Sequence, residues 1–128
     1  MRTREELNKI TEKIIGAAIE VHRNLGPGLL ESTYETCLLY ELTLLGMKVE
    51  SQVALPVIYK QVRLDCGYRM DLLIENEIVV KLKSVETLLP IHTAQNLSYL
   101  KLSNKPLGLL INLNVDNLID GIHQIIND

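Results

Sequence analysis

The spacing of the apolar residues changes near residue 46, and this change sets the predicted order of secondary structure. From Glu5 to Asn24 apolar residues recur every three or four positions, which is typical of an amphipathic helix. The Gly-Pro-Gly segment at 26–28 ends this helix, because proline lacks a backbone donor and glycine tolerates left-handed backbone. A second helix is predicted over 29–45, with Gly46 as its C-terminal cap.

Beyond residue 46 the pattern becomes that of strands. Apolar and polar residues alternate, and β-branched residues are frequent. The predicted strands are 47–59 (one or two strands, interrupted by Pro56), 61–65, 68–74 and 77–83. Glu75-Asn76 is predicted to be the turn of a hairpin between the last two strands.

The remaining segments are a helix over 92–102, an apolar strand over 107–113 and a closing helix over 116–126. The predicted order is therefore α-α-β-β-β-β-α-β-α. Most strands are consecutive, so hairpins dominate, and the strand after the third helix adds in parallel or mixed fashion. We expect an α/β (α+β) fold in which helices flank a mixed central β-sheet, formed as one domain by the 128 residues.

Composition and charge limit the classes of function. The net charge of −3 argues against the global cationic field of a non-specific DNA binder, but it leaves a local basic groove open. The two cysteines and three histidines lack zinc-ligand spacing. No apolar run is long enough to cross a bilayer, and residues 1–7 are too polar for a secretory signal, so we expect a cytoplasmic protein without membrane contact.

Three segments occur in an order that resembles a known family. The first is Gly28-Leu-Leu-Glu31-Ser-Thr-Tyr34, a G-x-x-E-x-x-Y sequence. The second runs from Gly67 through Arg69 and Asp71 to Lys83, and the third is a Q-x-x-x-Y helix with Gln95 and Tyr99. Together they resemble the GxxExxY family of the PD-(D/E)XK nuclease superfamily over residues 14–126. The resemblance implies a restriction-endonuclease-like core.

The resemblance also implies a chemistry. Nucleases of this superfamily hydrolyse phosphodiesters with Mg²⁺, which carboxylates hold and which activates water. Asp71 matches the position of the first metal ligand, and Lys83 matches the lysine that orients water or phosphate. Glu31 is the best candidate for a second acid. The resemblance thus implies Mg²⁺ or Mn²⁺ at Asp71 and Glu31, with the backbone carbonyl of Leu82 as a further ligand, provided that the site is still competent.

Further residues are expected to hold the substrate, which the resemblance identifies as DNA or RNA. Arg69, Gln95, Tyr99 and Lys101 are the candidates for substrate binding. Lys81, Lys83 and Lys105 add positive charge for phosphate contacts. A homodimer is also a candidate, since small domains of this superfamily often pair.

Lys81 departs from the family pattern. The pattern has E-L-K where this chain has Lys81-Leu82-Lys83, so a cation replaces a metal ligand. We expect Lys81 to repel Mg²⁺ and to form an ion pair with Asp71, which predicts impaired catalysis. The alternative is a non-catalytic nucleic-acid-binding or protein-interaction domain that retains the nuclease fold.

Each of these residues also has an ordinary structural interpretation. Glu31 can complement the dipole at the first turn of a helix, and the lysines of 77–83 can form a solvated strand face. Gln95 and Tyr99 can be a helix-surface pair, and His92 is expected to have a capping or surface role. Cys37 is expected to be a small core residue.

Overall fold

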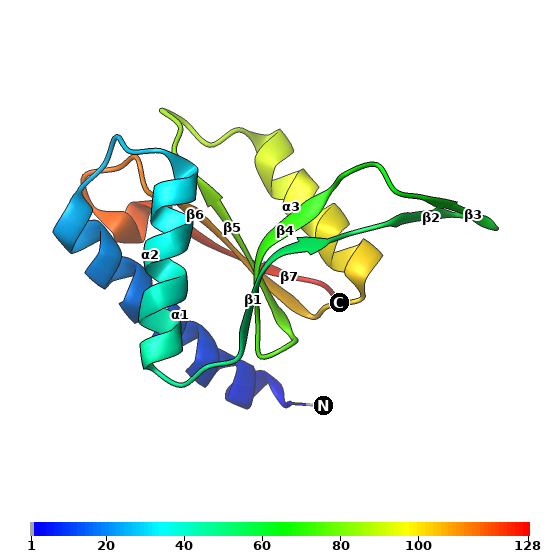
Figure 1. Cartoon of the computed structure of the whole chain (residues 1–128), viewed down its shortest axis with the longest axis horizontal. Helices are drawn as coiled ribbons and strands as arrows, with labels where there is room; N and C mark the ends of the chain where they lie inside the picture. Colours follow the sequence, from blue (N-terminus) through cyan, green and yellow to red (C-terminus); the bar gives the residue numbers. More distant parts are fainter. Residues whose placement is uncertain (1) are drawn as a thin grey trace.

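Three helices cover the two faces of a five-stranded sheet, and a separate two-stranded ribbon projects from it (Figure 1). This computed structural model describes residues 2–128. The helices are α1 (Arg4–Leu25), α2 (Glu31–Leu44), α3 (Pro90–Ser103) and the short 3₁₀ helix η1 (Leu118–Gly121). The strands are β1 (Val49–Ala54), β2 (Val57–Tyr59), β3 (Val62–Leu64), β4 (Arg69–Ile74), β5 (Ile78–Lys83), β6 (Leu107–Asn112) and β7 (Ile122–Ile126).

The main sheet has the order β1-β4-β5-β6-β7. Only β5 and β6 are parallel among the strands of this sheet in residues 2–128, and α3 is the crossover between them. The other neighbouring pairs are antiparallel. This arrangement confirms the predicted mixed sheet flanked by helices, including the parallel addition of the strand after the third helix.

The core lies in two layers, one on each face of the sheet. The larger layer joins α1 and α2 to the sheet, and fully buried Tyr34 and Leu38 belong to it. The smaller layer lies under α3 and contains Leu100 and Val79. No helix in residues 2–128 combines the length and the apolar character that a bilayer crossing requires.

The prediction of a closing helix over 116–126 was wrong. Only Leu118–Gly121 forms a single 3₁₀ turn, and the next residues form the antiparallel edge strand β7 on β6. The three-residue spacing of Ile119, Ile122 and Ile125 also fits one face of a helix. The open edge of β6 and the strand preference of isoleucine determined the outcome instead. The segment before α3 also holds five strands rather than four, because 47–59 divides at Pro56.

Candidate functional site

Asp71 lies where β4 and β5 separate. The last paired residues of these two strands on this side are Leu72 and Val80, so the amide of Leu82 has no partner in β4. The Asp71 carboxylate takes that place, because its Oδ2 accepts a hydrogen bond from the Leu82 N–H at 2.9 Å. Its other oxygen, Oδ1, lies 3.4 Å from the ammonium nitrogen of Lys81. Both carboxylate oxygens therefore have a protein donor, and the predicted ion pair is present.

A backbone irregularity lies opposite Asp71. In β1 the neighbouring pairs are Ser51–Leu72 and Val53–Met70, and Gln52 between them has a φ of +52°, in the left-handed region. Before this point Val49 packs with the α1–α2 layer, and after it Val53 packs with the α3 layer. The strand thus turns over at Gln52. Strained residues that the surrounding structure holds in place are frequent at functional sites.

Glu31 lies at the same free strand edge as Asp71. Its Oε2 accepts a hydrogen bond from the backbone N–H of Ser84 at 3.0 Å. The amides of Leu82 and Ser84 are two residues apart, so they point to the same side of the extended chain. Two carboxylates, one from β4 and one from α2, therefore bind successive outward amides at the end of β5. Asp71, Lys81 and Glu31 therefore lie at the same end of β5.

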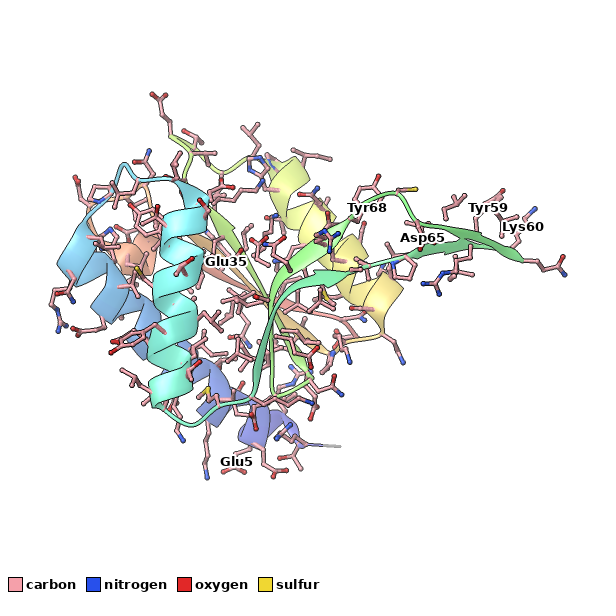
Figure 2. All side chains as sticks on the ribbon, viewed as in Figure 1. Glu5, Glu35, Tyr59, Lys60, Asp65 and Tyr68 are labelled. Carbon is pink, nitrogen blue, oxygen red and sulfur yellow. The ribbon has the colours of Figure 1, made fainter. Side chains whose placement is uncertain are left out.

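Glu35 is a third acid near this site, and the sequence analysis missed it. It lies one turn after Glu31 on α2 (Figure 2), and its Oε1 accepts a hydrogen bond from Gln52 Nε2 at 2.8 Å. Burial raises the pKa of the Glu35 carboxyl above its usual value, and the nearby Asp71 carboxylate raises it further. The hydrogen bond from Gln52 and the charge of Lys81 oppose this rise. The four-residue spacing from Glu31 on one helix face was the available signal.

Hydrogen bonds of the segment 28–34 connect the α1–α2 loop to this site. The buried Tyr34 hydroxyl donates to the Gly26 carbonyl at 2.6 Å and accepts from the Leu29 N–H at 3.1 Å. Gly28 has a φ of +95°, a conformation that favours glycine. The Ser84 hydroxyl donates to the Leu29 carbonyl at 2.7 Å, beside the bond between Ser84 and Glu31. The spacing of glycine, acid and tyrosine thus fixes the carboxylate of Glu31 against the end of β5.

Other predicted site residues have different surroundings. Lys83 is half-buried at the end of β5. Arg69 is exposed, and its guanidinium donates to the Gln52 carbonyl at 3.3 Å. It lies at the start of β4, two residues before Asp71.

The predicted site residues of α3 lie on the face of the sheet opposite to α2. Tyr99 is only 8% exposed, and its ring packs against Tyr68 with 6.0 Å between ring centroids, so it is part of the core. Gln95 is half-buried and Lys101 is exposed. His92 has the expected capping role, because its Nδ1 accepts from the Leu89 N–H at 3.0 Å. No hydrogen bond or ion pair in residues 2–128 joins these α3 side chains to Asp71.

The side chains at the end of β5 do not fit a Mg²⁺ site. Within residues 2–128, no group of three or more His, Cys, Asp or Glu side chains is arranged to hold a metal ion. Mg²⁺ needs oxygen ligands in near-octahedral geometry, whereas Asp71 is bound to an ammonium and an amide donor. A second cation next to Lys81 would be repelled. What this arrangement can do is hold a cation of its own, because Lys81 is paired with Asp71 and also acts electrostatically on Glu35.

In a comparison with protein-family models, residues 8–125 match the model of the PD-(D/E)XK nuclease superfamily. The chain belongs to this superfamily. The match covers both the α2 acid and the β4–β5 site, so the mixed sheet is that of a nuclease-like domain. Comparisons with curated proteins and with solved structures gave no match.

Proposed function

We propose that this PD-(D/E)XK domain binds nucleic acid through the face around the end of β5 and that its phosphodiester cleavage is impaired. The observation that carries the proposal is the 3.4 Å ion pair between Lys81 and Asp71. Lys81 stands where the superfamily pattern has an acid, and Asp71 stands where the pattern has a metal ligand. The sequence Gly28-x-x-Glu31-x-x-Tyr34, with the hydrogen bonds of Glu31 and Tyr34, supports a finer placement in the GxxExxY family.

The ion pair provides positive charge in the place where such a nuclease holds a metal. Lys81 is 21% exposed and Asp71 is 13% exposed, so the pair is shielded but reachable from solvent. A phosphate near the site can accept hydrogen bonds from the ammonium of Lys81, which has three donors and one close carboxylate partner. Lys83, two residues further along the strand, and Arg69 supply further charge for phosphate binding.

Metal titration tests the impaired site. We expect the wild-type chain to bind Mn²⁺ or Mg²⁺ weakly in calorimetry, and Lys81→Glu to bind more tightly, because it restores an acid and removes a cation. Lys101→Glu makes the same change in charge on the exposed side of α3 and serves as the control. Equal affinities for wild type and Lys81→Glu, or strong metal-dependent cleavage of DNA or RNA by the wild-type chain, would contradict the proposal.

A second titration tests nucleic-acid binding. The affinity for a labelled oligonucleotide, measured by fluorescence anisotropy, should fall steeply as salt rises, since phosphate contacts release counterions. Lys83→Ala with Lys101→Ala should weaken binding and lower the slope of log K against log salt by about 1 for each lost phosphate contact. The absence of binding to both DNA and RNA at low salt would favour the protein-interaction alternative.

A further inference from the structure

The ribbon of β2 and β3, which we call the arm (residues 57–64), has an uncovered apolar face. The cross-strand pairs Val57–Leu64 and Tyr59–Val62 lie on one side of it. Tyr59 is 61% exposed and Val62 is 53% exposed. A two-stranded ribbon is marginally stable by itself, and a contiguous exposed apolar face marks a contact surface. Such a face needs a partner.

The arm stands away from its own domain. Figure 1 shows it projecting at one end of the long axis, while α1 and α2 lie at the other end. Figure 2 places Tyr59 and Lys60 near its tip, with Tyr68 at its base. The body of the same chain therefore leaves the tip of the arm uncovered.

The surface of α1 and α2 offers a groove of matching character. A hollow of about 460 Å³ lies between these helices, and apolar residues of both helices contribute to its lining. The lining includes Val21, Leu25, Cys37, Tyr40, Glu20 and Glu41. The two glutamates also line an adjoining hollow of about 390 Å³, together with Gly16, Ala17, Leu44, Leu45 and Lys13. We call the two hollows the α1–α2 groove.

The charges of the two surfaces are complementary. The arm carries Lys60 and Arg63 and no acid, whereas Glu20 and Glu41 lie in the middle of the groove. The existing partners of these charges lie at the surface. Arg63 lies 3.4 Å from Asp65, and Lys60 lies over the Tyr59 ring at 5.4 Å from its centroid. Glu20 lies 3.3 Å from Arg23 and accepts a hydrogen bond from Asn24 Nδ2 at 2.9 Å. A nucleic acid would match the two cations but would leave the apolar face of the arm without a matching surface. A second copy of the chain matches both.

We propose that the arm of one copy lies in the α1–α2 groove of a second copy, and that the exchange is reciprocal. The arm and the groove lie at opposite ends of the molecule, so two antiparallel copies bring each arm to the groove of the other (Figure 1). Two-fold symmetry then makes two identical contacts and leaves no arm free for chain growth. Two contacts also bury twice the area that a single eight-residue arm buries.

Charge exchange tests the proposal on the full-length chain. We expect a dimer in analytical ultracentrifugation. Lys60→Glu with Arg63→Glu should weaken dimerisation at least about tenfold, and Glu20→Lys with Glu41→Lys should do the same. Combining all four changes should restore the dimer, because attraction returns with reversed signs. A quadruple variant that stays monomeric while circular dichroism and a thermal melt show it folded would overturn the pairing.

A control and two further outcomes complete the test. Lys9→Glu with Lys48→Glu reverses two exposed charges outside both surfaces and should leave the dimer intact. A wild-type chain that is monomeric at high concentration would overturn the proposal. It would also be overturned if arm charge reversal left the mass unchanged and abolished oligonucleotide binding, since the arm would then be a nucleic-acid contact. Dimerisation is independent of metal or nucleic-acid binding, so its failure leaves the proposed function untouched.

Discussion

The ammonium of Lys81 lies 3.4 Å from Asp71 Oδ1, on neighbouring strands that separate at this point. At about 4 Å and an effective dielectric of about 20, opposite unit charges attract by roughly 4 kcal/mol before desolvation is counted. Both side chains are largely shielded, so desolvation cancels much of this attraction. The pair therefore adds little net stability, but either partner alone is costly.

Removal of one partner of this pair should cost more than removal of both. Lys81→Met should lower the free energy of unfolding by about 1–3 kcal/mol. This loss is smaller than that for a fully buried ion pair, because both side chains are partly exposed. Lys81→Met with Asp71→Asn should recover most of this loss, because the asparagine oxygen can still accept from Leu82 N–H. Urea unfolding of wild type, Lys81→Met, Asp71→Asn and the double variant at one protein concentration gives the coupling energy between the two residues. Additive effects of the two changes would show that the residues do not interact.

Glu35, on α2 near this pair, should make the free energy of unfolding depend on pH. The pKa of Glu35 is raised in the folded chain, so its charged form is disfavoured there. Its contribution to stability is full below its ordinary pKa and is lost as pH rises through the raised value. Glu35→Gln should therefore be more stable than wild type near pH 7, by less than ~1 kcal/mol because the side chain is partly screened by solvent. The difference should vanish below about pH 4.

Thermal unfolding of both proteins between about pH 3 and pH 8 measures this difference. Glu12→Gln, at an exposed position of α1, controls for the loss of one negative charge. A difference that does not change with pH would contradict the assigned environment of Glu35.

The hydroxyl of Tyr34 should stabilise the α1–α2 connection. Tyr34→Phe keeps the buried ring but leaves the Gly26 carbonyl and the Leu29 N–H without their partner. We expect a loss of about 1–2 kcal/mol in urea unfolding. Tyr40→Phe removes a hydroxyl from an exposed ring on the same helix and should change stability by less than about 0.5 kcal/mol. Equal effects of the two changes would contradict the structural role of the Tyr34 hydroxyl.

Much of the fold was predictable because its signals are local. Helical spacing located α1, α2 and α3, and strand alternation located β1 to β6. The ion pair of Lys81 with Asp71 was predictable because the family pattern places both residues at one site. Glu35 was missed although its spacing from Glu31 was visible, because the family pattern names only one acid in that helix.

Other features depend on contacts distant in sequence. The strand β7 forms on the edge of β6, and no local pattern distinguishes its isoleucines from those of a helix. The strands of the arm were predicted, but nothing in 57–64 indicated that they separate from the main sheet. The core position of Tyr99 depends on its packing against Tyr68, which lies on another element.

One such distant contact leaves no room for a side chain at Gly121. A Cβ at position 121 would overlap the backbone oxygen of Asn112, which cannot move away as the end of a flexible side chain can. The side chain of Asn112 binds both the N–H and the carbonyl of Val85, next to Ser84. Gly121→Ala should therefore shift the end of β6, strain the segment after β5, and cost more than about 2 kcal/mol of stability.

Gly16 is the matched control, since it lies inside α1 and a Cβ there would meet nothing within 4 Å. Gly16→Ala should stabilise the chain by up to about 1 kcal/mol, because alanine loses less backbone entropy on forming a helix. Urea unfolding at a fixed protein concentration compares both variants with wild type. The two Gly→Ala changes should alter the free energy of unfolding in opposite directions. If Gly121→Ala were as stable as wild type, β6 and η1 would be free to separate. The connection through Asn112 would then contribute little to holding Ser84 against Glu31.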